Sequence, residues 1–311
     1  MTAPVSPSFV LVISTGGTIA STTDPASGAR TPSLSAEDLV RACGTTEEVR
    51  VYDAATLDSS SMTLADVDVI VRLTRKALDD AHIAGIVITH GTDSMAETAL
   101  ALDLVHSDPR PVVLTGAQLP ADHDRADGPA NLNRAISLAA DSLSRGRGVM
   151  VHFGGDTLAA RGMLKRDTGD LRAFDMSAPL PLPRPAAVEP APLDGFTVPI
   201  LRAWPGEDAS LVDMVTSTGP DGIIIEALGS GNVSTEMGAA IGRALETGIP
   251  VVISTSVPFG EVEFAYGGAG GGVSLGAHGA LPSGWLRAGQ ARIALITALA
   301  TGTDPADLLG L

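Results

Sequence analysis

The stretch LVISTGGTIA at residues 11–20 decides the fold. In it an apolar run leads directly into a Ser-Thr-Gly-Gly-Thr turn that ends at Thr18. Ligands of parallel α/β sheets lie beyond the carboxyl ends of the strands, and glycines there let the backbone approach a ligand closely. The turn allows three interpretations: a tight turn alone, a phosphate-binding loop, or a threonine nucleophile.

Apolar runs and helical patterns alternate along the first part of the chain. The runs are continuously apolar, as expected of strands that are buried on both faces. Strand, helix, strand, helix predicts an α/β parallel sheet with right-handed crossovers. Ser35 with Asp38, and Ser94 with Glu97, have the spacing of a capping box at a helix start. We expect strands at 9–14, 49–54, 85–90, 111–116 and 148–153, and helices at 35–43, 62–80 and 94–107.

The texture changes from 177 to 205, which is dense in proline and predicts an extended linker. The α/β pattern then resumes, so a domain boundary is expected near 185–200. The glycine-rich segment 263–279 predicts a mobile or irregular loop. We therefore expect an N-terminal α/β catalytic domain at 1–190, the end of the linker at 191–205 and a C-terminal α/β domain at 206–311. Within the latter we expect strands at 221–228 and 249–255, and helices near 233–247 and 290–301.

Composition excludes several classes of function. The formal net charge is −16, from 20 basic and 36 acidic residues, which disfavours binding to nucleic acid or to anionic lipid. The single cysteine, Cys43, permits no intrachain disulfide and reads as a plain structural thiol. The six histidines show no metal-binding spacing, so we expect no metal and no cofactor. The N-terminus lacks a basic signal-peptide region and no apolar stretch approaches the ~20 residues of a membrane span, so we expect a cytoplasmic protein.

Four motifs carry candidate chemistry. The glycine turn matches neither G-x-G-x-x-G nor the P-loop pattern, which disfavours nucleotide binding. Thr92 and Asp93 follow a strand and open a helix, where free N–H groups favour an anion or an oxyanion. Lys165 reads alone as a solvated charge, but beside an Asp in a dry site it would activate a hydroxyl. The serines after the second strand would suit a small carboxylate, although serines are common in turns. There is no G-x-S-x-G elbow, which disfavours a Ser-His-Asp hydrolase.

Taken together, these motifs resemble one family, the bacterial-type L-asparaginases with their glutaminase-asparaginase relatives. The resemblance covers essentially the whole chain. The two motifs that resemble the family signatures are TGGTIA at 15–20 and THGTDSMAET at 89–98. Matching segments in the same order are DSSSM (58–62), TGAQLP (115–120), DGPANL (127–132), the Lys165 segment and GSGN (229–232).

The resemblance implies a role for each matching residue. It implies that Thr18 is the primary nucleophile and that Thr92 is the second catalytic threonine, with Asp93 and Lys165 as its partners. The remaining roles are in substrate binding: Ser59 at the α-carboxylate, Asp93 at the α-ammonium and Ala117 with its backbone beside the side-chain amide. Ser60 and Thr92 are also expected to bind substrate, and Asn232 would come from a neighbouring subunit.

The family fold implies a larger N-terminal α/β domain and a smaller C-terminal one. It also implies active sites between the subunits of a homodimer, commonly paired into a homotetramer. The implied reaction is an amidohydrolysis in which Thr18 attacks the side-chain carbonyl of asparagine, ammonia leaves, and water hydrolyses the β-aspartyl ester to aspartate. Thr92, Asp93 and Lys165 would form the proton relay, and backbone N–H groups near Thr92 and Ala117 would stabilise the oxyanion.

Three departures from the family pattern bear on function. The loop at 21–33 lacks the family's activating tyrosine, and Ala29 or Arg30 lies nearest to that position. Ser60 stands where some glutaminase-competent members carry a longer amide, so glutamine selectivity is open. The acidic residue that a neighbouring subunit supplies in some members has only Glu261 and Glu263 as candidates.

Three alternatives stand beside an asparagine amidohydrolase. One is a mixed glutaminase-asparaginase, which would release ammonia from glutamine at a comparable rate. Another is the tRNA-linked amidotransferase subunit of this fold; the start of the chain almost at the first motif and the charge of −16 count against it. The last is an amino-acid-binding homologue, which would bind aspartate or asparagine without turnover.

Overall fold

The computed structural model describes residues 8–311. Residues 1–7, which open the expected domain 1–190 and belong to the stretch without a signal-peptide pattern, lie outside the described residues. The chain forms two compact units: Met1–Ala160 with Lys165–Asp175, and Arg161–Leu164 with Met176–Leu311. The expected limits at 190 and 206 stay a prediction.

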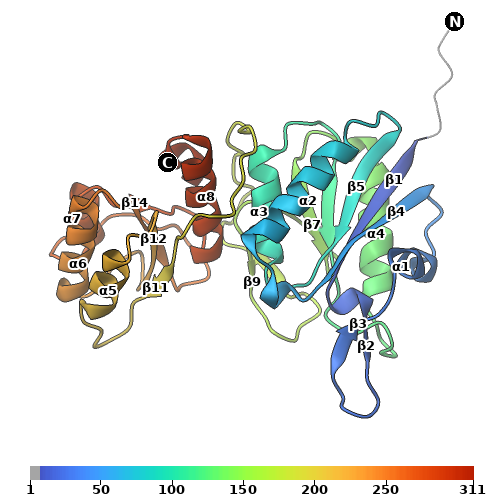
Figure 1. Ribbon diagram of the computed structural model, residues 1–311, viewed down its shortest axis with the longest axis horizontal. Helices are drawn as coiled ribbons and strands as arrows, with labels where there is room; N and C mark the ends of the chain where they lie inside the picture. Colours follow the sequence, from blue (N-terminus) through green and yellow to red (C-terminus); the bar gives the residue numbers. More distant parts are fainter. Residues whose placement is uncertain (1–7) are drawn as a thin grey trace, which may run out of the picture. The chain divides into compact units, whose positions relative to one another are not determined.

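Unit 1 is built on a six-stranded sheet in the order β4-β1-β5-β6-β7-β8 (Figure 1). The first five strands are parallel, which confirms the expected α/β parallel sheet. A sixth strand, β8, is added at the edge and is antiparallel to β7. The strands are β1 Phe9–Gly16, β4 Val49–Leu57, β5 Ile83–Thr89, β6 Val112–Thr115, β7 Val149–Phe153 and β8 Asp156–Ala159.

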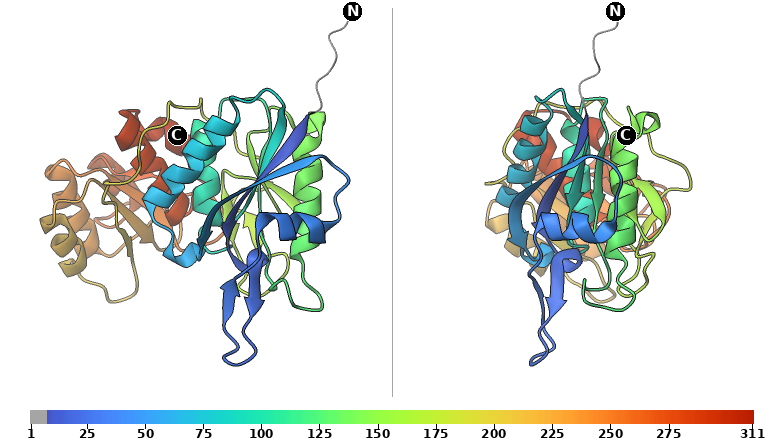
Figure 2. Two further views of the ribbon diagram at one scale, coloured as in Figure 1. Left: turned by 45° about the vertical axis from the view of Figure 1, so that its right-hand side comes forward. Right: turned by 90° about the vertical axis from the view of Figure 1, so that its right-hand side faces the viewer.

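Helices cover both faces of this sheet, α2 and α3 on one face and α1 and α4 on the other (Figure 2). Val10 and Val12 of β1 pack into one buried cluster with residues of α1 and α4, and their neighbours along the strand face the opposite side. This two-sided burial explains why the strands read as continuous apolar runs. The helices are α1 Ala36–Cys43, α2 Leu64–Ala77, α3 Met95–Val105 and α4 Gly128–Ala140, with a short 3₁₀ turn η3 at Ser142–Ser144.

The starts of α1 and α3 test the two predicted capping boxes. Ser35 and Asp38 form the expected capping box at α1. The box predicted for Ser94 and Glu97 is wrong, because the Ser94 side chain makes no cap hydrogen bond and instead donates to the Ser59 carbonyl oxygen at 2.8 Å. Ser94 thus ties the start of α3 to the serine segment after β4.

The segment at 21–33 folds as a β-hairpin of β2 (Ser21–Thr23) and β3 (Arg30–Pro32). It extends from the carboxyl end of the sheet directly after the 3₁₀ turn η1, Thr18–Ala20 (Figure 1). Asp122 fastens the hairpin by accepting the backbone N–H of Thr23 at 2.8 Å. The hairpin is therefore tied at the end of β2 that leads into its loop.

Unit 2 has a four-stranded parallel sheet in the order β11-β12-β13-β14. No helix or strand lies between Met176 and Ile200, but β11 forms within the end of the linker expected at 177–205. The prediction of an irregular loop at 263–279 is wrong in part, because α7 forms within it. The elements are β11 Ile200–Arg202, β12 Ile223–Ala227, β13 Val251–Thr255, β14 Leu281–Pro282, α5 Ser210–Ser217, α6 Thr235–Glu246, α7 Gly272–Ala277, α8 Ala288–Thr301 and α9 Pro305–Leu309.

Across residues 8–311, no helix combines the length and the apolar character that a bilayer crossing requires.

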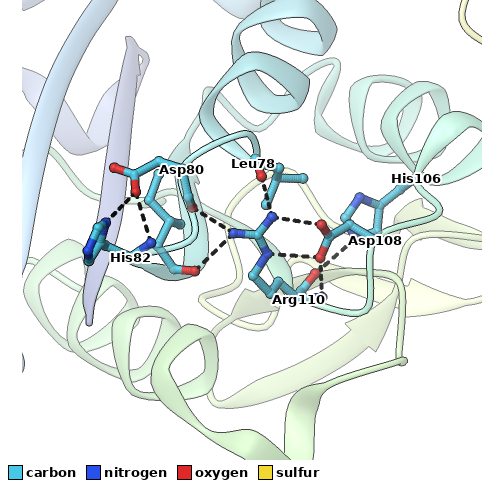
Figure 3. Close-up of polar contacts among 7 residues, drawn as sticks. Leu78, Asp80, His82, His106, Asp108 and Arg110 are labelled. Atoms are coloured by element: carbon cyan, nitrogen blue, oxygen red, sulfur yellow. Dashed lines mark hydrogen bonds and ion pairs between the residues drawn. The ribbon is translucent and has the colours of Figure 1, made fainter. Parts of the chain in front are cut away.

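A partly buried arginine, Arg110, organises the edge of the unit 1 sheet at which the strands begin (Figure 3). The Arg110 guanidinium holds both carboxylate oxygens of Asp108, at 3.0 and 2.7 Å. It also donates to three backbone carbonyl oxygens between the end of α2 and the start of β5, those of Leu78, Asp80 and Ile83. One side chain just before β6 thus holds the turn between α2 and β5 in place.

We expect Arg110→Met to lower the free energy of unfolding by about 2–3 kcal/mol, since it leaves a half-buried carboxylate and three carbonyls without their donor. The hydrogen bond from Arg110 lowers the pKa of the Asp108 carboxyl. A depressed carboxyl pKa contributes stability above the unfolded value of about 3.9 and loses it as the pH falls through the folded value. The difference between the two proteins in urea unfolding should therefore be largest near neutral pH and narrow as the pH falls through the folded pKa of Asp108, to the part that the three carbonyl contacts contribute.

The matched control is Arg172→Met, which breaks the more exposed pair with Asp156 and should cost less than about 1 kcal/mol. Equal losses in the two variants would show that the three carbonyl contacts of Arg110 add nothing.

Candidate active site

Four segments meet at the carboxyl edge of the unit 1 sheet, after β1, β4, β5 and β6. They are the turn that leads to Thr18, the serine turn η2 (Ser59–Ser61), the loop at 90–94 and the turn at 116–120. Parallel strands bring their carboxyl ends to one edge, so residues far apart in the sequence come together there.

The Gly-Gly turn is shaped by a close approach between two of these segments. Gly17 has φ +80°, and a Cβ on it would lie 2.6 Å from both the Cα and the N of Gly91. A side chain at this point would separate the two loops. The glycines thus hold Thr18, which is partly exposed at the start of η1, next to the segment that carries Thr92.

Lys165 joins Thr92 and Asp93 in one polar cluster. Its Nζ lies 2.8 Å from Thr92 Oγ1 and 2.8 Å from Asp93 Oδ1. Thr92 is buried, whereas about half of the Asp93 side chain (54%) and a quarter of the Lys165 side chain (25%) are exposed. The cluster therefore joins a buried hydroxyl, through an amine, to a carboxylate that faces solvent.

Ser59 fixes the same loop from the other side. Its buried hydroxyl accepts the backbone N–H of Asp93 at 3.2 Å. Gly91 makes room for it, because a Cβ there would lie 2.3 Å from Ser59 Oγ. The neighbouring Ser60 is exposed, and its N–H is capped by Asp58.

The turn that carries Ala117 is braced by the start of α4. The Asp127 carboxylate accepts the backbone N–H groups of Gln118 and Leu119. The Asn131 side chain donates to the Gly116 carbonyl and to Asp127. Sequence reasoning matched Asp127 and Asn131 only as part of a motif and missed their positioning role. Sequence reasoning predicted no helix at 128–140; the Asp-Gly-Pro start, with proline in the first turn of the helix, is the signal that could have indicated α4.

His90 lies beneath the site and does not open into it. It is fully buried, with Nδ1 2.7 Å from the Gly91 carbonyl oxygen. Burial lowers the pKa of its imidazole, so the ring is neutral at pH 7. Its place in the sequence beside Thr92 therefore reflects packing.

The structure brings together in unit 1 the residues predicted at Thr18, Ser59, Ser60, Thr92, Asp93, Ala117 and Lys165. Asn232 belongs to unit 2, where its backbone pairs with Leu228, and Glu261 and Glu263 are exposed in the same unit. In the hairpin of unit 1, Ala29 and Arg30 are exposed. Among residues 8–311 no three His, Cys, Asp or Glu side chains cluster as metal ligands would.

Comparisons with known proteins add an independent finding. Residues 9–187 match the family model described as Asparaginase, N-terminal, and residues 197–310 match the Glutaminase/Asparaginase C-terminal domain. The chain is 30% identical to an L-asparaginase of Bacillus licheniformis over 94% of this chain and 95% of that protein. It is also 34% identical to a component of the glutamyl-tRNA(Gln) amidotransferase of Methanopyrus kandleri, over 81% of this chain and 62% of that protein.

A solved structure is similar over nearly the full length. The crystal structure of a "Probable Cytoplasmic L-asparaginase" from Campylobacter jejuni matches with a TM-score of 0.82 and 26% identity, covering 97% of this chain and 98% of that one. Fold and sequence thus point to the same family.

Proposed function

Because the chain belongs to the asparaginase family, we propose that it is an L-asparaginase, which hydrolyses L-asparagine to L-aspartate and ammonia. One observation carries the assignment of chemistry to residues: Lys165 Nζ contacts Thr92 Oγ1 and Asp93 Oδ1, both at 2.8 Å, at the edge that also holds the Thr18 turn. A hydroxyl, an amine and a carboxylate that contact one another in this order form a proton relay of the kind that activates a weak nucleophile.

In this proposal the Thr18 hydroxyl attacks the side-chain carbonyl carbon of asparagine. The C–N bond breaks, ammonia leaves with a proton from the relay, and a β-aspartyl ester forms on Thr18. Water, activated by Thr92 and Lys165, then adds to the ester carbonyl and releases aspartate. The Thr18 hydroxyl is free for this role because no hydrogen bond holds it within residues 8–311.

The substrate's backbone groups would bind beside the relay. Ser59 and the exposed Ser60 would receive the α-carboxylate, and the solvent-facing carboxylate of Asp93 would receive the α-ammonium. The backbone at Ala117, held by Asp127 and Asn131, would lie beside the carboxamide and donate to the oxyanion. Asn232 would come from the second unit of a neighbouring subunit in a homodimer or homotetramer. A cytoplasmic location is supported by the similarity to the Campylobacter protein.

The test is ammonia release by the purified protein with L-asparagine and L-glutamine in parallel. Release from asparagine with little from glutamine is the expected result. Comparable rates would make the protein a mixed glutaminase-asparaginase. A folded protein that binds aspartate saturably but releases no ammonia would be an amino-acid-binding homologue, and the proposal would fall.

A further inference from the structure

The loop at 166–173 directly follows Lys165 and, like the lysine, belongs to unit 1. The backbone N–H of Arg166 donates to the carbonyl oxygen of Ala173 at 2.8 Å, and Ala173 is fully buried. Inside the loop the Asp167 carboxylate accepts two backbone N–H groups, at 2.7 and 2.8 Å. The loop is thus closed at its two ends and folded on itself, so a displacement of its far side is passed to the residue that follows Lys165.

The turn between β7 and β8 supports the far side of this loop. Gly154 in that turn approaches so closely that a Cβ on it would lie 2.8 Å from the carbonyl carbon of Leu171. Gly154 is itself held, because its N–H donates to the side-chain oxygen of Asn131 on α4 at 3.1 Å. Phe153, the residue before it, meets Phe174 edge to face, with ring centroids 5.1 Å apart. The turn and the loop are therefore in direct backbone and side-chain contact.

A second support comes from the turn that carries Ala117. The side-chain amide of Gln118 donates to the carbonyl oxygen of Thr168 in the loop. The backbone N–H of Gln118 is held by Asp127, so this side chain extends from a fixed point. One residue therefore joins the turn proposed to stabilise the oxyanion to the loop that follows Lys165.

An ion pair adds a third contact to the loop. Arg172 Nε donates to the Asp156 carboxylate on β8 at 2.9 Å. Both side chains are well exposed, and exposed ion pairs contribute little to stability. Gly154 and Gln118 therefore provide the stronger supports, and all of these residues belong to unit 1.

A lysine side chain is a flexible four-carbon stem, so the backbone around it decides where the amine can rest. A displacement of about 1 Å at a catalytic group can cost about a hundredfold in rate. We propose that Gly154 and Gln118, through the loop at 166–173, position the Lys165 amine within its polar cluster. Both are positioning residues for the reaction, an inference that rests on the proposed function.

Gly154→Ala tests this support with a matched control one residue away. The added methyl meets the backbone of Leu171, so the turn and the loop have to separate. Gly155→Ala is the control, because Gly155 lies in the same turn with φ +91°, but a Cβ there meets nothing within 4 Å. Gly154 has φ +58°, which lies within the left-handed region that other residues can adopt. Backbone strain is therefore greater in the control, and only Gly154→Ala displaces the loop.

Two readouts separate positioning from stability. The first is steady-state kinetics with asparagine, together with aspartate binding by calorimetry. We expect kcat to fall about tenfold or more in Gly154→Ala, with KM and aspartate affinity within about threefold of the parent. Gly155→Ala should keep the parent kcat even where its thermal midpoint falls further than that of Gly154→Ala.

Gln118→Met is the second variant, and it decides the question if Gly154→Ala does not fold. Methionine keeps much of the length of the side chain but cannot donate to the Thr168 carbonyl. Loss of this contact should lower kcat about threefold or more with little change in KM. A change confined to KM would indicate a contact with substrate and overturn the positioning role of Gln118.

The second readout needs no activity. The chain has two lysines, Lys76 and Lys165, and Lys76 is exposed on α2. Limited acetylation followed by peptide mass spectrometry therefore gives the reactivity of Lys165 relative to an internal reference. Release of the Lys165 amine from its cluster should raise this ratio about threefold or more in Gly154→Ala and leave it unchanged in Gly155→Ala.

The two readouts also separate failure of the inference from failure of the proposed function. A raised acetylation ratio in Gly154→Ala, when the parent never releases ammonia, would keep the positioning role and overturn the activity. An active parent whose kcat and acetylation ratio are unchanged in Gly154→Ala would overturn the inference, and so would a fall in kcat without a change in the ratio. If Gly154→Ala does not fold, parental values of both quantities in Gln118→Met would overturn it.

Discussion

Replacing Thr18 by valine is expected to lower kcat for asparagine by about a thousandfold or more, because it removes the attacking hydroxyl. Valine keeps the branched shape of threonine, and no hydrogen bond to the Thr18 hydroxyl exists among the described residues. The free energy of unfolding should therefore change by less than about 0.5 kcal/mol. Ammonia release and urea unfolding, measured on the same preparations, check both parts.

Thr18→Ser is the conservative counterpart. It keeps a hydroxyl on the same turn, so a substantial part of the activity should remain, and the acyl-enzyme should still form. Rapid quenching of the parent and of Thr18→Ser with asparagine, followed by mass spectrometry, should show a mass increase equal to asparagine minus ammonia. The adduct should map to the peptide that contains Thr18 and be absent from Thr18→Val.

An adduct on the peptide of Thr92, or a Thr18→Val protein with near-parental kcat, would contradict the assignment of the nucleophile. Thr22→Ala is a suitable control, because Thr22 lies on the hairpin after η1 and its hydroxyl bonds to the hydroxyl of Ser33, away from the polar cluster around Lys165. It should leave kcat within about twofold of the parent.

The sequence was sufficient for the parts of the fold that depend on local pattern. The continuous apolar runs at 9–14 and 85–90 correctly indicated strands buried on both faces, since a parallel sheet between two helical layers leaves few positions exposed to solvent; their polar residues, such as Ser14 and Thr89, lie at the carboxyl ends. The capping box of Ser35 was correct because its two partners lie three residues apart. The Ser94 prediction failed because its hydroxyl donates to a long-range partner, the Ser59 carbonyl oxygen, and does not accept the backbone N–H of Glu97 as a cap would.

For the candidate site too, features with a local sequence signal could be predicted, and contacts between distant residues could not. The motifs placed Thr92 and Asp93 at a helix start, but nothing local to Lys165 shows that its amine meets them across about seventy residues of sequence. The brace from Asp127 and Asn131 to the Ala117 turn was also hidden, because a side chain that holds a distant backbone leaves no periodic signal. The hairpin at 21–33 was missed since its strands are only three residues long.

Lys165→Met should lower kcat by about a hundred- to ten-thousandfold, the range of a lost proton-transfer group, while aspartate binding stays within about threefold of the parent. Methionine preserves much of the length of the stem but removes the amine that contacts Thr92 Oγ1 and Asp93 Oδ1. Steady-state kinetics and calorimetry with aspartate measure the two quantities separately. Lys76→Met, on the exposed face of α2, is the matched control and should retain full activity.

Lys165→Arg separates the charge of the lysine from its proton. A guanidinium keeps the positive charge beside Asp93 but does not release a proton under ordinary conditions, so it cannot accept one from a hydroxyl. We therefore expect Lys165→Arg to be about as slow as Lys165→Met if the amine relays a proton. Parental kcat in Lys165→Arg would contradict the relay and reduce the role of Lys165 to electrostatic support of Thr92, which a fixed cation supplies equally well.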